Sequence, residues 1–318
     1  MSDALPMDLT IDGVRVRERE PLAPFTTYKI GGPARWLIEV EARAALPELL
    51  SRLAAADVPW LVLGNGSNVL VSDRGFAGAV LVLGGELAAL ELTRDAYGPG
   101  AHRVRAGAAV SMTRLLRLAK DEALSDLWVL AGIPGTVGGA VRMNAGTRFG
   151  ELARVLVGAE VCSSEGYRFV ENDRLNLSYR ASELPAGTLV TSADLRVGDA
   201  DPAMRDKLDE VLAYRKATQP LHLPSCGSVF ANPPGDAAGR LIEAAGLKGR
   251  REGGAEISPQ HANWIVNLGA ATAADVHALI TTCRREVLAR TGVLLRPEVQ
   301  LVGDWTADER RALHEEAP

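Results

Sequence analysis

The feature that most constrains this chain is a run of small residues rich in glycine, Gly132–Gly146, which reads GIPGTVGGAVRMNAG. Glycine adopts positive φ without steric cost and lets other groups approach the backbone, although it costs conformational entropy in regular structure. A second segment of this kind, Gly64–Asn68 (GNGSN), directly follows the apolar run Trp60–Leu63. Backbone N–H groups around such turns bind phosphate oxygens. The two segments together predict a site for a diphosphate ligand.

Neither segment matches the familiar nucleotide-binding motifs. Gly64 and Gly66 begin a dinucleotide-binding pattern, but Val69 occupies the position of its third glycine. The other segment, over Gly132–Gly139, lacks the lysine followed by serine or threonine that a P-loop requires. Any phosphate site therefore has another architecture, and the alternative that these glycines only form tight turns stays open.

Composition and charge limit the class of protein. The 318 residues are 47% hydrophobic and 24% charged, which is typical of a soluble globular protein of two or three domains. A net charge of -5 disfavours general nucleic-acid binding. No apolar run is long enough to cross a bilayer, and Met1–Pro6 does not resemble a signal peptide. We therefore expect a cytosolic (cytoplasmic) protein with no membrane or nucleic-acid partner.

Cysteine and histidine usage predicts reduced thiols and no metal site. Cys162, Cys226 and Cys283 are far apart and odd in number, which does not fit a disulfide framework. The five histidines also lack the spacing of metal ligands.

Hydrophobic patterning predicts an α+β fold. Helical spacing predicts helices over Ala42–Asp57, Met204–Thr218 and Ala237–Ala245, the last ending before Gly246, and another helix that begins after Ser111 as its N-cap. The clearest helix is expected over Thr272–Arg290. It begins with a capping-box-like pair, Thr272 and Asp275, and ends at Gly292. Short apolar runs predict strands at 60–63, 69–72, 79–83, 155–162, 167–170, 189–197 and 294–302. The polar stretch Gly198–Pro202 is the candidate domain boundary, and 304–318 is a charged tail or a terminal helix.

Several motifs in order resemble one enzyme family, the UDP-N-acetylenolpyruvoylglucosamine reductases. They span about residues 26 to 303: TTYKIGGPA from Thr26, GNGSN with VLV from Gly64, Gly132–Gly146, LSYRAS from Leu177, PSCGSVF from Pro224, AAGLKG from Ala244, QHAN from Gln260 and RPEV from Arg296. No single motif is decisive, but the ordered set is highly specific.

The resemblance implies a vanillyl-alcohol-oxidase-type FAD-binding fold. Two α+β subdomains, expected at 1–86 and 87–200, would hold FAD, and a C-terminal α+β substrate-binding domain would occupy 201–318. Because no histidine lies within Tyr28–Gly84, we expect the FAD to be bound without a covalent link. Members of the family use NADPH to reduce FAD, which passes a hydride to the enolpyruvyl methylene of UDP-N-acetylglucosamine enolpyruvate. The product is UDP-N-acetylmuramate, a peptidoglycan precursor, and we expect a monomer.

Three catalytic residues follow from the resemblance. Ser228 corresponds to the proton donor of the family, which protonates a strongly basic enolate. Arg180 would pair with the substrate carboxylate and stabilise the developing charge. Glu298 is expected on a strand, on the face opposite to that of Val299. Its carboxyl, if protonated, would donate a hydrogen bond to the enolate. Without the resemblance, each is more readily read as an ordinary turn or surface residue.

The remaining site residues also come from the resemblance. The expected FAD contacts are Gly64, Asn65, Gly66, Ser67, Asn68, Gly132, Ile133, Pro134, Gly135, Gly138, Gly139, Asn144, Ala145 and Gly146. The expected substrate contacts are Tyr179, Asn232, Lys248 and His261. Two departures stand out: Ala231 replaces a basic residue that relatives often carry, and the chain is of a compact subtype without the tyrosine lid loop.

Three alternatives remain at this point. Cys226 with His222 suggests a cysteine hydrolase, although both flank Pro224 in a loop. Another flavoenzyme of the same fold, such as an alcohol or sugar oxidase, is the stronger rival. A nucleotide-binding module without catalysis would leave Ser228, Arg180 and Glu298 without a shared purpose.

Overall fold

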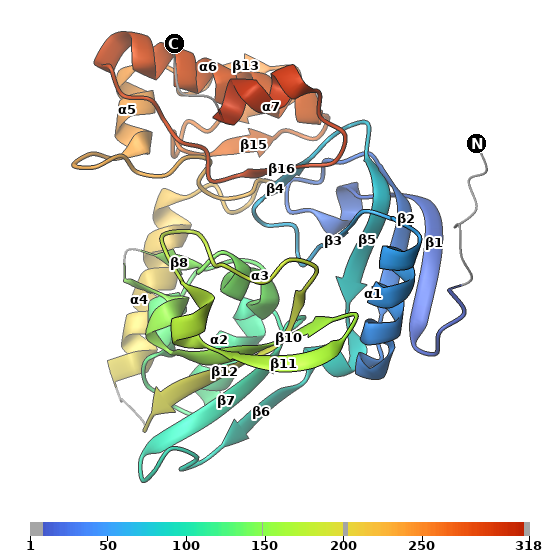
Figure 1. Cartoon of the computed structure of the whole chain (residues 1–318). Coiled ribbons are helices and arrows are strands. Elements are labelled where there is room, and N and C mark those ends of the chain that lie inside the picture. The colour runs from blue at the N-terminus through green and yellow to red at the C-terminus, as the bar shows by residue number, and fades with distance from the viewer. Residues whose placement is uncertain (1–8, 148, 200–202, 315–318) are drawn as a thin grey trace. The chain divides into compact units, whose positions relative to one another are not determined.

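The computed structural model describes residues 9–147, 149–199 and 203–314 (Figure 1). Met1–Pro6 and residues 200–202, the last three of the candidate domain boundary, lie outside this range. The chain divides into two compact units, each discontinuous in sequence. Unit 1 contains residues 1–18, 36–65 and 78–214, and unit 2 contains residues 19–35, 66–77 and 215–318. None of the helices in the described ranges is both long and apolar enough to cross a membrane.

Unit 1 is built around two sheets. One has the strand order β1 (Val14–Pro21), β2 (Pro33–Val40), β5 (Phe76–Leu83) and β3 (Trp60–Val62), with β3 parallel to β5. In the division given above, residues 19–21 of β1, 33–35 of β2 and 76–77 of β5 belong to unit 2. The other sheet is antiparallel, in the order β11 (Gly166–Glu171), β10 (Leu156–Ser163), β12 (Leu189–Gly198), β7 (Ala101–Gly107) and β6 (Leu90–Thr93).

Four helices and two apolar cores complete unit 1. Helix α1 (Leu46–Ala55) buries Leu46, Leu49, Leu50 and Leu53 beside Trp36 and Ile38. The second core joins the antiparallel sheet to α2 (Met112–Asp121), α3 (Val137–Arg142) and α4 (Ala203–Thr218). The Ser111 side chain accepts a hydrogen bond from the Arg114 N–H, so the predicted N-cap of α2 is confirmed. A short hairpin, β8 (Gly146–Thr147) and β9 (Gly150–Glu151), follows α3.

Unit 2 gathers three segments of the chain around one core. Strands β13 (Arg251–Glu252), β14 (Ala255–Ile257) and β15 (Ile265–Asn267) form an antiparallel sheet, and β16 (Gln300–Val302) pairs in parallel with β4 (Val69–Val71). Helices α5 (Ala238–Ala244), α6 (Ala273–Thr291) and α7 (Ala307–His314) complete the unit. Its core joins Tyr28, Ile30 and Leu70 to residues that follow them by about 150 positions or more, such as Phe230 and Ile242.

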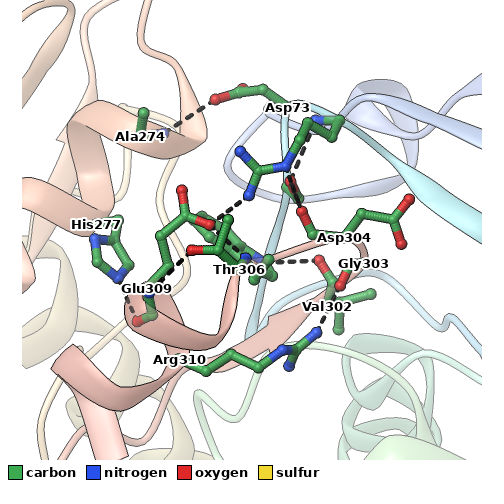
Figure 2. A network of polar contacts seen from close by, with 12 residues as sticks. Asp73, Ala274, His277, Val302, Gly303, Asp304, Thr306, Glu309 and Arg310 are labelled. Atoms are coloured by element: carbon green, nitrogen blue, oxygen red, sulfur yellow. Dashed lines mark hydrogen bonds and ion pairs between the residues drawn. The ribbon is translucent and has the colours of Figure 1, made fainter.

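A polar network links the turn after β4 to the C-terminal part of unit 2 (Figure 2). The Asp73 carboxylate accepts hydrogen bonds from the N–H groups of Ala273 and Ala274, at 2.8 and 3.0 Å, and so caps α6. Arg74 pairs with Glu309 and donates to the Asp304 carbonyl. His277 stacks on Trp305 and hydrogen-bonds the Glu309 carbonyl.

Most predicted elements are present, but one strand is wrong. The helix expected over Ala42–Asp57 is a 3-10 turn followed by α1, and the predicted α6 has its capping box and its left-handed Gly292. The strand expected over 294–302 reduces to β16, because Pro297 lacks an N–H and forms only an isolated bridge with Phe230. Glu298 therefore precedes β16 rather than lying within it. The three expected domains stay a prediction.

Candidate active site

A cavity of about 1150 Å³ lies within unit 1. Its walls include Leu61–Asn65 at the end of β3, Ala108 and Ala109 after β7, and Leu184–Val190 before and within β12. Thr136 before α3 and Gly138, Gly139 and Arg142 on α3 also line it. Four predicted cofactor residues, Gly64, Asn65, Gly138 and Gly139, are among the lining residues. The Asn65 side-chain amide also approaches the Gly135 carbonyl at 3.5 Å. The structure therefore brings the first two residues of one glycine segment against the middle of the other.

The glycines of this cavity differ in what a side chain would meet. A Cβ on Gly64 would lie 2.5 Å from the Thr136 hydroxyl, and one on Gly138 would lie 2.8 Å from the Ala108 Cβ. Those two glycines are required by the packing of the protein itself. A Cβ on Gly139 would meet nothing closer than 3.6 Å, and its φ is not positive. Open space beside bare backbone at Gly139 fits a large ligand that approaches α3 closely.

The other predicted cofactor residues do not line this cavity. Gly66, Ser67 and Asn68 belong to unit 2, where the Gly66 carbonyl accepts hydrogen bonds from Thr27. The Asn68 side chain donates to the Glu298 carbonyl at 3.0 Å. Gly132, Ile133, Pro134 and Gly135 form the turn into α3, with positive φ at Gly132 and Gly135. Their assignment to FAD stays a prediction.

Asn144 and Gly146 hydrogen-bond the segment 178–180, and neither they nor Ala145 line the cavity. Asn144 is buried and donates to the Glu151 carboxylate and the Ser178 carbonyl, at 2.9 and 3.0 Å. The Gly146 carbonyl accepts a hydrogen bond from the Arg180 guanidinium at 2.9 Å. Arg180 has a φ of 58°, and its guanidinium lies over the exposed ring of Tyr179. The Gly146 carbonyl and the Tyr179 ring thus hold the head group of Arg180.

In unit 2, Ser228 and Glu298 lie on adjoining segments. Glu298 N–H donates to the Val229 carbonyl at 2.8 Å, and Phe230 bridges Pro297 in antiparallel register. The residue after Ser228 is therefore hydrogen-bonded to Glu298. Ser228 is exposed and follows Gly227, whose φ of 81° requires glycine or strain. The structure brings these two predicted residues together, whereas Arg180 belongs to unit 1.

Asn263 is a residue whose role the sequence did not reveal. It is buried, and its side chain accepts from the Phe230 N–H at 3.0 Å and donates to the Phe230 carbonyl at 2.8 Å. Its own carbonyl accepts from the Val229 N–H. Asn263 thereby holds the segment that follows Ser228. The QHAN motif was its only signal, and that motif did not disclose the partner.

The predicted substrate residues of unit 2 form a polar group around α5. The Lys248 ammonium pairs with Glu243 at 2.8 Å. His261 accepts a hydrogen bond at Nδ1 from the Asn263 N–H, so the neutral ring carries its proton on Nε2. Burial, followed by the nearby Lys248 charge, lowers the pKa of His261. Asn232 accepts from the Ala238 N–H at 3.0 Å and caps α5, which leaves its amide NH₂ for a ligand.

Cys226 does not have the properties of a hydrolase nucleophile. Its thiol is 4% exposed, and burial raises its pKa to about 12. A nucleophilic cysteine instead needs a lowered pKa and access to substrate. The Cys226–His222 hypothesis therefore loses its chemical basis. Within the described ranges, no three His, Cys, Asp or Glu side chains are placed to hold a metal ion.

Comparison with known proteins first defines the class. A family model described as "FAD binding domain" matches residues 34–169, which include Gly64, Gly138 and Gly139 of the cavity. The chain is thus a flavoprotein with an FAD-binding fold of the vanillyl-alcohol-oxidase type.

A second family model, "UDP-N-acetylenolpyruvoylglucosamine reductase, C-terminal domain", matches residues 219–302. A protein of that name from Myxococcus xanthus is 46% identical over 93% of this chain and 95% of its own length, and one from an Anaeromyxobacter species is 42% identical over 92% and 90%. The crystal structure of the Thermus caldophilus reductase superposes with a TM-score of 0.75 at 39% identity, covering 91% of this chain and 98% of that one. The chain belongs to the UDP-N-acetylenolpyruvoylglucosamine reductase family and is a flavin-dependent oxidoreductase. The resemblance drawn from the sequence is confirmed.

Proposed function

We propose that this protein reduces UDP-N-acetylglucosamine enolpyruvate to UDP-N-acetylmuramate with NADPH as electron donor. The observation that carries the proposal is the register of unit 2, where Ser228 and Glu298 lie on adjoining hydrogen-bonded segments. Relatives that bear the name of this reductase align over nearly the whole chain and so support the same substrate.

FAD would occupy the cavity of unit 1 and supply the hydride chemistry. The space beside Gly139 and the small residues Ala108 and Ala109 would let the cofactor approach the backbone. The Gly64–Asn65 turn would add a second backbone contact, and the apolar side chains of Leu61 and Val190 would exclude water.

The protein would then supply position, charge stabilisation and one proton. Ser228 is exposed after a turn fixed by Gly227, so its hydroxyl is free to donate a proton to the substrate carbon. Arg180, held by the Gly146 carbonyl, would bind the substrate carboxylate. Glu298 would donate a hydrogen bond to the developing enolate, a role that requires its carboxyl to be protonated.

The group around α5 would bind the UDP part of the substrate. Lys248 offers a point charge to the diphosphate, and His261 offers an Nε2 proton. Asn232 and the exposed Tyr179 would add hydrogen bonds or ring contacts. Ala231 is buried and contributes no cation, so more of the charge recognition depends on Lys248.

The decisive experiment is anaerobic stopped-flow spectroscopy of the flavin. After reduction with NADPH, the substrate should re-oxidise the flavin rapidly. Ser228→Ala should slow re-oxidation about a hundredfold or more while reduction by NADPH stays unchanged, since general-acid catalysis contributes about 10²–10⁴-fold. Ser51→Ala, an exposed serine of α1, is the matched control.

Two results would overturn the proposal. A flavin that remains reduced until oxygen is admitted would replace the reductase with an oxidase of the same fold. Full re-oxidation in Ser228→Ala would remove the proton-donor role. Equally fast reduction of the oxidised flavin by NADH and by NADPH would discard only the NADPH preference.

We further propose a monomeric, cytosolic enzyme with small-molecule partners only. The acidic net charge of -5 supports the absence of a nucleic-acid partner. Size-exclusion chromatography with light scattering tests the oligomeric state, and a mass of twice 33.7 kDa would contradict it.

A further inference from the structure

The cavity of unit 1 has an unusual distribution of charge. Its wall consists of apolar, small and uncharged polar residues with two exceptions, Asp57 and Arg142. Asp57 follows α1, and Arg142 is the last residue of α3. Among the described residues that line this space, Arg142 is thus the only one with a cationic side chain.

Arg142 lies on the face of α3 that the cavity exposes. The residues of α3 that line the cavity are Gly138, Gly139 and Arg142. Arg142 follows Gly139 by three positions and Gly138 by four, so it lies on the same side of the helix as both glycines. Val137, Ala140 and Val141 are buried on the opposite side. A ligand resting on the bare glycine backbone would therefore meet the Arg142 side chain about one turn, or roughly 5 Å, further along.

Contacts within the protein hold the backbone of Arg142 and leave its head group available. Ser182 donates to the Arg142 carbonyl at 2.8 Å. Other arginines of unit 1, such as Arg43 and Arg105, pair with Glu160 and Asp194. Over residues 9–147, 149–199 and 203–314, the Arg142 guanidinium has no such carboxylate partner.

We propose that Arg142 is the residue that neutralises the diphosphate of FAD. This assignment rests on the proposed placement of FAD in the unit 1 cavity. A guanidinium makes paired, charge-assisted hydrogen bonds to phosphate oxygens, which neutral backbone groups cannot match in charge. The Asp57 carboxylate would repel the diphosphate, so the diphosphate lies at the α3 end of the cavity.

The test measures affinity of the flavin-free protein rather than turnover. FAD and ADP are each titrated into wild type, Arg142→Ala and Arg142→Lys by calorimetry, at low and high salt. Arg117→Ala is the matched control, because Arg117 lies on α2 of the same unit, is 83% exposed and does not line the cavity.

We expect Arg142→Ala to raise the Kd of both FAD and ADP about tenfold or more, the size of a lost charge-assisted hydrogen bond. Its affinity should also depend less on salt than that of wild type. Arg142→Lys should recover part of the loss, and Arg117→Ala should match wild type. An unchanged Kd in Arg142→Ala overturns the proposal, as does a loss confined to FAD with ADP unaffected.

A cavity-filling variant separates this proposal from the placement of FAD. Gly139→Val adds a side chain where the protein leaves room. If Gly139→Val abolishes FAD binding and Arg142→Ala does not weaken it, the cavity holds FAD and the role of Arg142 is wrong. If Gly139→Val binds FAD like wild type, the placement itself fails.

Discussion

At the scale of single residues, burial decides what the three cysteines can do. Burial raises the pKa of Cys226 and of Cys283 to about 12, and that of Cys162 to about 11. All three side chains are nearly inaccessible. Since the thiolate is the reactive form, these residues are apolar packing groups of their cores rather than reagents.

The native protein should therefore resist thiol reagents. We expect Ellman's reagent at pH 8 to modify none of the three cysteines rapidly, and all three once urea unfolds the chain. The release of absorbance with time measures both. If one thiol of the native protein reacts rapidly and this reaction is lost in Cys226→Ala, Cys226 is accessible. The hypothesis that it is a catalytic nucleophile would then have to be reconsidered.

His261 makes stability depend on pH in a defined direction. Its pKa in the folded state is lowered from the ordinary 6.5, first by burial. The unfolded chain therefore binds a proton before the folded chain does, and the free energy of unfolding falls as pH drops through about 6.5. We expect His261→Gln to lose less stability than wild type between pH 7.5 and 5.5 in urea titrations. Equal losses in both proteins would exclude His261 as a contributor.

At the scale of secondary-structure elements, the sequence predicted those features that depend on interactions between residues close together in the chain. Helix α6 begins with a capping box between Thr272 and Asp275 and ends at Gly292 with a φ of 70°, all of which the sequence indicates. Strand β1 (VRVREREP) carries a weaker signal, because only Val14 and Val16 alternate with exposed arginines and the rest of the strand is mostly charged and exposed. It depends on pairing within its sheet. The Asp73 cap of α6 comes from a residue 200 positions away, which no local pattern could reveal.

The capping box gives a prediction for stability. Thr272→Ala should lower the free energy of unfolding by about 1 kcal/mol, because the Asp275 N–H loses its hydrogen-bond acceptor. Thr272→Ser keeps the hydroxyl and serves as the control. Urea unfolding followed by circular dichroism measures both, and equal loss in the two variants would show that the methyl group, not the cap, matters.

The candidate site was also predictable only in part, because much of it depends on contacts between segments that are far apart in the sequence. The sequence indicated glycine segments, and Gly64 and Gly138 of these segments line one cavity. It did not indicate Arg142, since an arginine at a helix end is common. Nor could it place Ser228 beside Glu298, because that register depends on hydrogen bonds between segments about 70 residues apart.

At the scale of the whole molecule, removal of FAD should affect the two units unequally. A bound ligand at 100 times its Kd stabilises the folded state by about 2.7 kcal/mol. We expect hydrogen exchange of β3 and α3 amides, which border the cavity, to accelerate when FAD is stripped, while α6 amides change little. Faster exchange in α6 with α3 unaffected would argue for a cofactor site in unit 2.

The order of the segments along the chain has a consequence for biosynthesis. Unit 2 needs Tyr28, Leu70 and Asp73 from early segments, but their partners in α6 and β16 come only near the C-terminus. At roughly 5–20 residues per second, a ribosome would hold those early segments without their partners for about ten seconds or longer. Apolar side chains such as Ile30 would be exposed to chaperones during that interval. Unit 2 would thus be completed only once α6 and β16 have been synthesised, when nearly all of unit 1 has already emerged.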